Sequence, residues 1–134
     1  MVALSKISQI HASRTTGQEI SIDTSVASTV LDLSPYVGYN TLTIQVENNG
    51  AIGGSSLAHT LALTGGIGGT DLTVPSGLFV TGAASFANVT TTSYNAIVIL
   101  KAGSLTSLKL TFTRSGTSPT GLLRVRIMQS DCVV

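Results

Sequence analysis

Hydrophobic and polar residues alternate with a period of two along several stretches of the chain. In the segment 41–47, Leu42, Ile44 and Val46 fall on one face, and threonine, glutamine and glutamate occupy the other. The same alternation recurs in the segments 18–23, 57–63, 108–113 and 123–128. A period of two is the pattern of a β-strand with one face in the core and the other in solvent. These segments predict an all-β fold.

Further short strands are expected between the strongly alternating ones. The segments 25–33, 72–74, 78–80 and 85–92 are rich in valine, leucine, threonine and phenylalanine. The segment 96–100 is apolar on both faces, which favours a strand that is covered on each side. About eight or nine strands at regular spacing are typical of an antiparallel β-sandwich made of two sheets.

Glycine, proline and asparagine mark the connections between these strands. The segment 115–121, with Gly116, Pro119 and Gly121, joins two strongly alternating stretches and predicts a hairpin across residues 105–128. Residues 1–17 show no clear partner strand, although Leu4 and Ile7 would also fit one face of a helix. We therefore expect residues 1–17 to be an N-terminal arm or edge strand, and residues 18–134 to be a single β-sandwich domain.

The chain carries few charges for its length. Hydrophobic residues make up 43% of the sequence and charged residues 10%, with a formal net charge of +1, whereas soluble domains contain about 25% charged residues. The absence of a basic block argues against a nucleic-acid partner. A weakly charged surface offers little electrostatic resistance to self-association, so we expect a permanent assembly.

Nothing in the sequence suggests a membrane or a secretory route. The longest apolar run, residues 96–100, is far shorter than the roughly 20 residues that cross a bilayer as a helix. The first ten residues are broken by serine, lysine and glutamine and do not resemble a signal peptide. We expect no membrane partner and synthesis in a host cytoplasm.

The residues that could support catalysis or metal binding are few and scattered. His59 falls on the more apolar face of its strand and is expected to be a buried histidine, whereas His11 is expected to be solvated. Neither belongs to a zinc-ligand spacing. Cys132 is the single cysteine, expected as a free thiol with intermolecular pairing as the alternative. No Gly-x-Ser-x-Gly elbow is present.

The carboxylates and the glycine-rich segment have equally ordinary interpretations. Asp71 is expected to be a turn carboxylate, because a calcium site would need more oxygen ligands. The Gly65-Gly66-Ile67-Gly68-Gly69 segment lacks the Gly-Lys-Ser/Thr of a phosphate-binding loop. Its glycines should instead supply positive φ angles or close backbone approach. We expect no catalytic residue, no cofactor and no metal, and hence no enzyme.

A carbohydrate-binding module is a serious alternative for a β-sandwich of this size. Sugar platforms stack rings on exposed aromatic side chains, and this chain has no tryptophan. Tyr36 and Tyr39 flank a turn, and Tyr94 opens a strand. The three could form a small platform, but for Tyr36 and Tyr39 a role in covering the end of the sandwich is favoured.

The segment Leu31-Asp32-Leu33-Ser34-Pro35-Tyr36, followed by Leu42-Thr43-Ile44-Gln45-Val46, resembles the loop-to-strand transition of jelly-roll domains. With the expected terminal hairpin and the composition rich in threonine, serine, glycine and valine, the chain is similar to small virion proteins of tailed bacteriophages, of the capsid decoration or cement type. This resemblance implies a jelly-roll domain that forms a homotrimer on the capsid surface and binds the major capsid protein lattice. A phage tail or baseplate component and a sugar-binding or adhesion module are the alternatives.

The resemblance assigns no binding residue. The expected interface residues are apolar side chains that the strand pattern leaves unplaced, namely Leu4, Ile7, Ile10 and Ile52.

Overall fold

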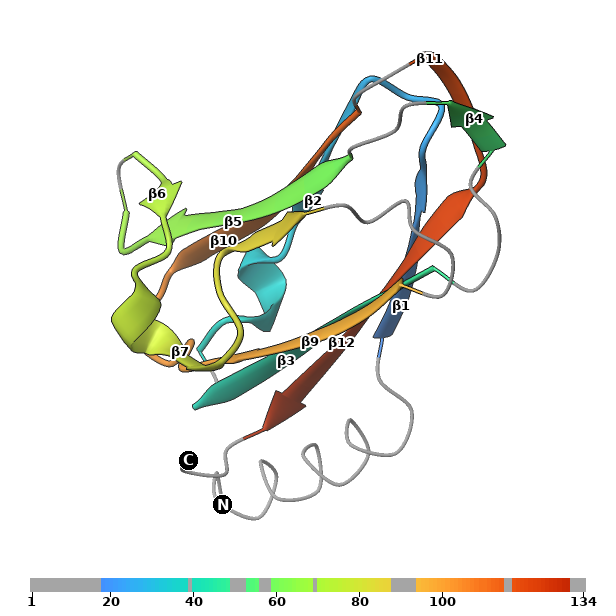
Figure 1. The fold of residues 1–134 in the computed structure, drawn as a ribbon. Coiled ribbons are helices and arrows are strands. Elements are labelled where there is room, and N and C mark those ends of the chain that lie inside the picture. Colours follow the sequence, from blue (N-terminus) through green and yellow to red (C-terminus); the bar gives the residue numbers. More distant parts are fainter. Residues whose placement is uncertain are drawn as a thin grey trace.

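The computed structural model describes residues 18–38, 40–48, 53–55, 59–68, 70–87, 94–114 and 117–130. They form two antiparallel five-stranded sheets that face each other (Figure 1). This confirms the prediction of an all-β, two-sheet β-sandwich. The expected arm, residues 1–17, lies outside the described residues.

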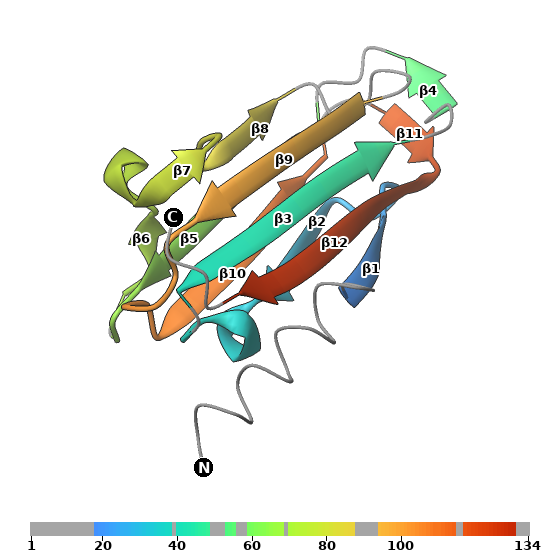
Figure 2. The ribbon, with the colours of Figure 1, turned by 90° about the horizontal axis from the view of Figure 1, so that it is seen from below.

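The first sheet, sheet A, has its strands side by side in Figure 2. Their order is β1 (Gln18–Asp23), β12 (Leu122–Ser130), β3 (Thr41–Asn48), β9 (Tyr94–Leu100) and β7 (Phe79–Thr81).

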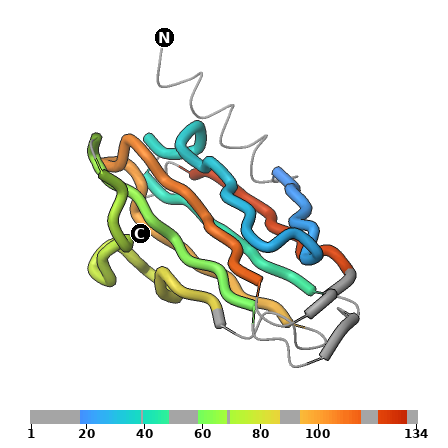
Figure 3. Tube along the Cα trace, turned by 90° about the horizontal axis from the view of Figure 1, so that it is seen from above, coloured from blue at the N-terminus to red at the C-terminus, as the bar shows by residue number. Residues whose placement is uncertain are grey.

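The second sheet, sheet B, is seen from its own side in Figure 3. Its order is β2 (Ser28–Asp32), β10 (Ser107–Thr113) and β5 (Thr60–Gly66), followed by β6 (Leu72–Thr73) and β8 (Ser85–Ala87), which both pair with β5.

Smaller elements complete the described fold. They are the pair β4 (Gly53–Ser55) and β11 (Thr117–Thr120), and the 3-10 turns η1 (Ser34–Tyr36) and η2 (Ser76–Leu78). The structure has more strands than the eight or nine expected, and the short strands β4 and β11 are the two that the sequence did not predict.

Eight of the described strands pair in a nested order. β5 pairs with β8, β3 with β9, β2 with β10 and β1 with β12, so the chain folds like one long hairpin from its middle to its ends. The pairings of β5 with β10 and of β3 with β12 then join these pairs into the two sheets. This nested winding of eight strands is that of a jelly roll.

The core lies between the two sheets, where the alternating apolar side chains meet. Sheet A contributes residues such as Leu42, Ile44 and Val46, and sheet B contributes residues such as Leu110 and Phe112, all fully buried. Each such side chain stabilises the fold by about 1.5–3 kcal/mol relative to an exposed one. The faces that the alternation assigned to the interior in β3, β5, β10 and β12 are therefore the buried ones.

The expected hairpin across residues 105–128 is wrong. β10 pairs with β2 and β5 in sheet B, whereas β12 pairs with β1 and β3 in sheet A. Both sheets of a sandwich bury one face, so both show the same alternation. The pattern identifies the buried face of a strand but not the strand beside it.

The strand expected over residues 25–33 begins only at Ser28. A turn precedes it, in which Asp23 Oδ1 accepts hydrogen bonds from the Ser25 backbone N–H at 2.9 Å and from the Ser25 hydroxyl at 2.7 Å. Such aspartate-centred turns stop a strand by giving the backbone a local partner. Val26, which follows this turn, is 47% exposed, and Val30, on the outer face of β2, is 55% exposed.

The loop after β2 is held by a similar contact. The Ser34 N–H donates to Asp32 Oδ1 at 3.0 Å, and the Ser34 hydroxyl oxygen accepts the Leu108 N–H at 3.1 Å. The bond to Leu108 connects η1 to β10. The chain passes through η1 on its way from β2 of sheet B to β3 of sheet A. None of the helical turns within the described ranges is long or apolar enough to cross a membrane.

Candidate interaction surfaces

The outward-facing side chains of sheet A form rows that run across its strands. Directly paired residues of neighbouring strands lie on the same face of a sheet. One row joins Thr81, Ile99, Thr43 and Met128 across β7, β9, β3 and β12. This row, together with Ile97 of the next one, is called the apolar end of sheet A below.

The rest of the same face is polar or charged, beginning with the row of Ile97 itself, which continues through Gln45 and Arg126 to Glu19. Arg126 forms ion pairs with Glu47 and, at 3.3 Å, with Glu19, and Arg124 lies 4.0 Å from Glu19. Gln45 donates a hydrogen bond to Asn95 Oδ1 at 2.9 Å. Arg126 and Glu47 are partly buried, whereas Glu19 and Arg124 are exposed. Exposed ion pairs such as Arg124 with Glu19 contribute little to stability, about 0–1 kcal/mol. They do neutralise one another, which leaves this end without a dominant sign of charge.

The expectation that residues 96–100 are covered on both faces is wrong for the described part of the chain. Val98 and Leu100 face the core and are buried, but Ile97 is 47% exposed and Ile99 is only partly buried. Their strand, β9, lies between β3 and the short β7, and its outer face is open. Two isoleucines are thus presented on a surface where a one-sided strand would carry polar residues.

The most exposed large apolar side chains lie at the turn between β5 and β6. Ile67 is 76% exposed and Leu72 is 68% exposed. The register pairs Gly65 with Leu72, so the chain reverses between them and places both side chains at one end of the sandwich. Figure 1 shows this turn at the opposite end from β4 and β11. We call Ile67 and Leu72 the β5–β6 tip.

Polar contacts fasten this tip to the start of β10. The Asp71 carboxylate accepts a hydrogen bond from the Ser107 hydroxyl and lies 3.1 Å from Lys109 Nζ. The Thr106 N–H donates to the Gly66 carbonyl at 2.9 Å. The hydrogen bond from Ser107, and then Lys109, lower the pKa of Asp71 below its ordinary value. Asp71 is therefore a turn carboxylate with structural contacts, as expected.

Two glycines of the glycine-rich segment have clear structural reasons. A Cβ atom at Gly65 would lie 2.6 Å from the Ser107 carbonyl oxygen, and Gly68 has a φ angle of +102°. Close backbone approach and positive φ are the roles that the sequence predicted for this segment. They allow β5 to lie tightly against β10 and the chain to turn just beyond Ile67.

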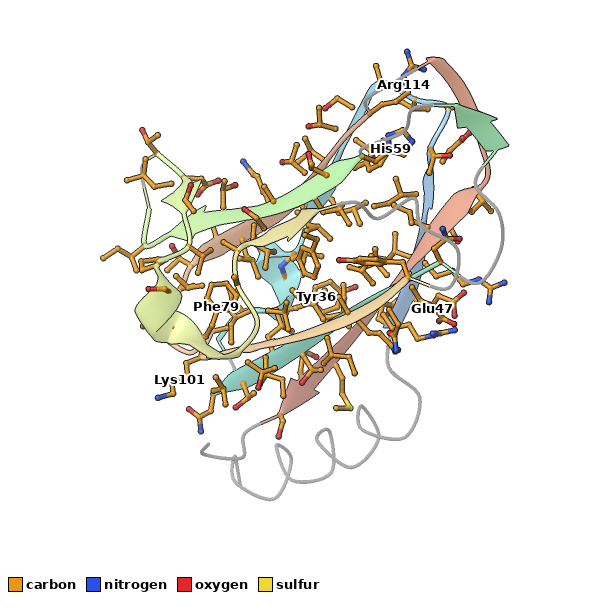
Figure 4. The ribbon with its side chains drawn as sticks, in the orientation of Figure 1. Tyr36, Glu47, His59, Phe79, Lys101 and Arg114 are labelled. Carbon is orange, nitrogen blue, oxygen red and sulfur yellow. The ribbon has the colours of Figure 1, made fainter. Side chains whose placement is uncertain are left out.

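His59 is buried, as expected from its place on the apolar face. Its ring packs edge to face against Phe112, with ring centroids 5.3 Å apart and an interplanar angle of 74°. Burial, and then the positive charge of Arg114, lower the pKa of His59 below 6.5. Figure 4 shows His59 and Arg114 at the same end of the sandwich. At neutral pH the ring is accordingly neutral.

The tyrosines give little support to a sugar-binding platform. Tyr36 and Tyr94 are partly buried and pack against the hydrophobic core, and Figure 4 shows Tyr36 between the two sheets. Burial also raises the pKa of Tyr94. Tyr39, the third member of the possible platform, lies outside the described residues.

The expected interface residues Leu4, Ile7, Ile10 and Ile52 lie outside the described residues, as do His11 and Cys132. In the part that is described, no three His, Cys, Asp or Glu side chains gather as metal ligands would.

Sequence reasoning missed Ile67, Leu72, Ile97 and Ile99. A signal for Ile67 was present, because glycine neighbours on both sides leave no adjacent side chain to cover it. Searches of protein-family models and of curated proteins found no match to the chain.

Proposed function

We propose that the chain is a non-enzymatic structural protein of the virion decoration or cement type, which binds a lattice of major capsid protein through the β5–β6 tip. The observation that carries this proposal is the exposure of Ile67 and Leu72 at a tightly fastened turn. Two large apolar side chains exposed at the same turn are a candidate for a site that binds another protein.

The construction of the tip favours binding. Asp71 is tied to Ser107 and Lys109, and Gly66 is tied to Thr106. A turn that is already ordered loses less conformational entropy when it binds, so more of the contact energy appears as affinity. Ile67 and Leu72 would fill an apolar recess on the partner, and Lys109 would lie at the polar rim.

The remaining features support an assembled rather than a solitary protein. The low charge fraction of 10% and the net charge of +1 oppose self-association weakly. A jelly roll is the architecture of many capsid-associated domains, although the fold alone does not determine function. A homotrimer on the capsid surface agrees with the resemblance described above.

Co-sedimentation with capsids that lack the protein tests this proposal. Capsids would be prepared from the genome that encodes the chain after its gene has been deleted, and mixed with the purified wild type or the Ile67→Ser/Leu72→Ser variant. Both substitutions lie on exposed side chains, so the fold should remain intact. We expect the variant to lose most of its binding.

The matched control is Val30→Ser, which removes an exposed apolar side chain from β2 rather than from the tip. It should bind as the wild type does. Equal binding by all three proteins would contradict the role of the tip, and no binding by the wild type would contradict the lattice function. Binding to tails instead of heads would favour a baseplate component, and binding to glycans a sugar-binding module.

A further inference from the structure

The outer face of sheet A is incomplete at its apolar end. β9 carries an unbroken apolar run from Ala96 to Leu100, the sequence pattern of a strand covered on both faces. In the described part of the chain only the inner face is covered, and Ile97 remains 47% exposed. Val80, on the neighbouring β7, is 40% exposed as well.

The start of the described chain lies at this same end of the face. β1 is the edge strand of sheet A, and its first residue, Gln18, pairs with Ile127. Met128, the next residue of β12, belongs to the apolar row. The preceding residues 1–17 therefore join the sheet at the edge of the row that holds Met128, next to Glu19 and its ion pair with Arg126.

Residues 1–17 also have a matching composition. They contain Leu4, Ile7 and Ile10 at intervals of three, and neither aspartate nor glutamate. The charged end of the face is already neutralised internally by Arg124 and Arg126. We therefore expect residues 1–17 to interact with this face through apolar contacts with Ile97, Ile99 and Met128.

The length of the segment is sufficient. β1 and β9 are three interstrand spacings apart, or about 14 Å at about 4.8 Å per spacing. Residues 1–17 would span about 25 Å as a helix and about 56 Å when extended. Because the segment is tethered at the edge of the face, its local concentration there exceeds that of a second copy in dilute solution.

We propose that residues 1–17 of the chain dock on the outer face of sheet A of the same molecule, with Leu4, Ile7 and Ile10 covering Ile97, Ile99 and Met128. The segment then covers the outer face of β9, whose inner face is already covered by the core. This inference does not rest on the proposed capsid function, because it concerns the purified chain alone.

A spin label on the segment tests the contact through methionine methyl signals. The chain has two methionines, Met1 and Met128, so a sample labelled with ¹³C at the methionine methyl groups gives a very simple spectrum. The Met128 signal is assigned with Met128→Leu. In a full-length Cys132→Ser background, the spin label is attached at Ser8→Cys, which leaves the apolar side chains intact.

We expect the label at position 8 to remove the Met128 signal by paramagnetic broadening. A label at Ser85→Cys, on the exposed side of sheet B, should leave the signal unchanged. Position 8 is close in sequence to Gln18, which pairs beside Met128, so an undocked segment would also broaden the signal in part. Adding Leu4→Ser, Ile7→Ser and Ile10→Ser to the chain labelled at position 8 should restore much of the signal, and equal broadening with and without these substitutions would overturn the proposal.

Mixing the two labels on separate molecules distinguishes a segment on its own sheet from one on a second copy. Spin-labelled chains without ¹³C are mixed with ¹³C-labelled chains without the spin label. An unchanged Met128 signal in this mixture is expected. Broadening of the Met128 signal in this mixture, or a Met128 signal equally intense with the label at position 8 and at position 85, would overturn the proposal.

Discussion

At the residue scale, the sequence is most tightly constrained at buried positions where an additional atom or an additional charge would destabilise the fold. Gly65 is the clearest of them, because a Cβ atom there would meet the Ser107 backbone oxygen at 2.6 Å. His59 is the second, because burial disfavours the charged form of its ring and lowers its pKa. Each gives a prediction that depends on a single side chain.

Gly65→Ala should destabilise the protein by about 1–3 kcal/mol, the usual cost of overpacking a close contact. The backbone of β10, and not a flexible side chain, would have to move. Gly77→Ala is the control, because it meets nothing within 4 Å and should be neutral or slightly stabilising. Urea unfolding of both variants measures the difference, and equal midpoints would contradict the tight approach of β5 and β10.

The stability of the protein should fall as the pH drops below about 6.5 because of His59. Its folded-state pKa is lowered, so the unfolded chain binds a proton at a higher pH than the folded chain does. The stability that the neutral ring contributes is present above 6.5 and is lost as the pH falls toward the lowered pKa.

His59→Asn removes this titration. Melting temperatures measured between about pH 7.5 and pH 5, the range in which a histidine titrates, should therefore decline less steeply in the variant than in the wild type. Parallel slopes would show that His59 titrates alike in the folded and unfolded chains. The comparison uses slopes, so a constant loss of stability in the variant does not affect it.

At the scale of the element, the sequence predicts burial far better than it predicts pairing. The alternation in Leu42, Ile44 and Val46 correctly identified the inner face of β3. Each strand's own sequence shows which of its faces is buried, whatever strand lies beside it. The partner of a strand depends on contacts distant in sequence, and β10 and β12 carry the same pattern in different sheets. The wrong hairpin follows directly from this difference.

In the candidate surfaces too, some features could be predicted from the sequence and others could not. The turn roles of Gly65 and Gly68 could be predicted from glycine chemistry, and the burial of His59 from its strand face. The exposure of Leu72 and Ile97 could not, because both read as ordinary strand residues. It depends on β6 being two residues long and on β7 adding only a short edge beside β9.

Cross-linking of cysteine pairs tests the pairing of β10. In a Cys132→Ser background, Thr64→Cys/Lys109→Cys places two thiols directly opposite each other on β5 and β10, within reach of a short thiol-reactive cross-linker because such Cβ atoms are about 4.5–5.5 Å apart. We expect efficient intramolecular cross-linking, detected as a mass increase on an unreduced monomer.

The contrasting pair is Lys109→Cys/Arg126→Cys, which a hairpin between β10 and β12 would bring close together. The structure places these residues on the outer faces of opposite sheets, so this pair should remain uncross-linked. Efficient reaction of the second pair, with failure of the first, would contradict the nested winding.

At the scale of the whole molecule, the two candidate surfaces have different proposed roles, one in binding a partner and the other in binding a segment of the same chain. The β5–β6 tip presents Ile67 and Leu72 on a fastened turn and is proposed to bind a capsid lattice. The apolar end of sheet A is proposed to be covered by residues 1–17 of the same chain. The Asp71 and Ser107 contact stiffens the first surface, while the exposed Ile97 and the position of Gln18 define the second.

Electron microscopy of particles made with and without the gene tests the central claim most directly. Heads from the intact genome and from the genome lacking this gene would be imaged and averaged under identical conditions. The account predicts extra density on the outer surface of intact heads, in threefold clusters that match a homotrimer and touch the major capsid protein. Heads that are indistinguishable in the two preparations, or a difference confined to the tail, would contradict it.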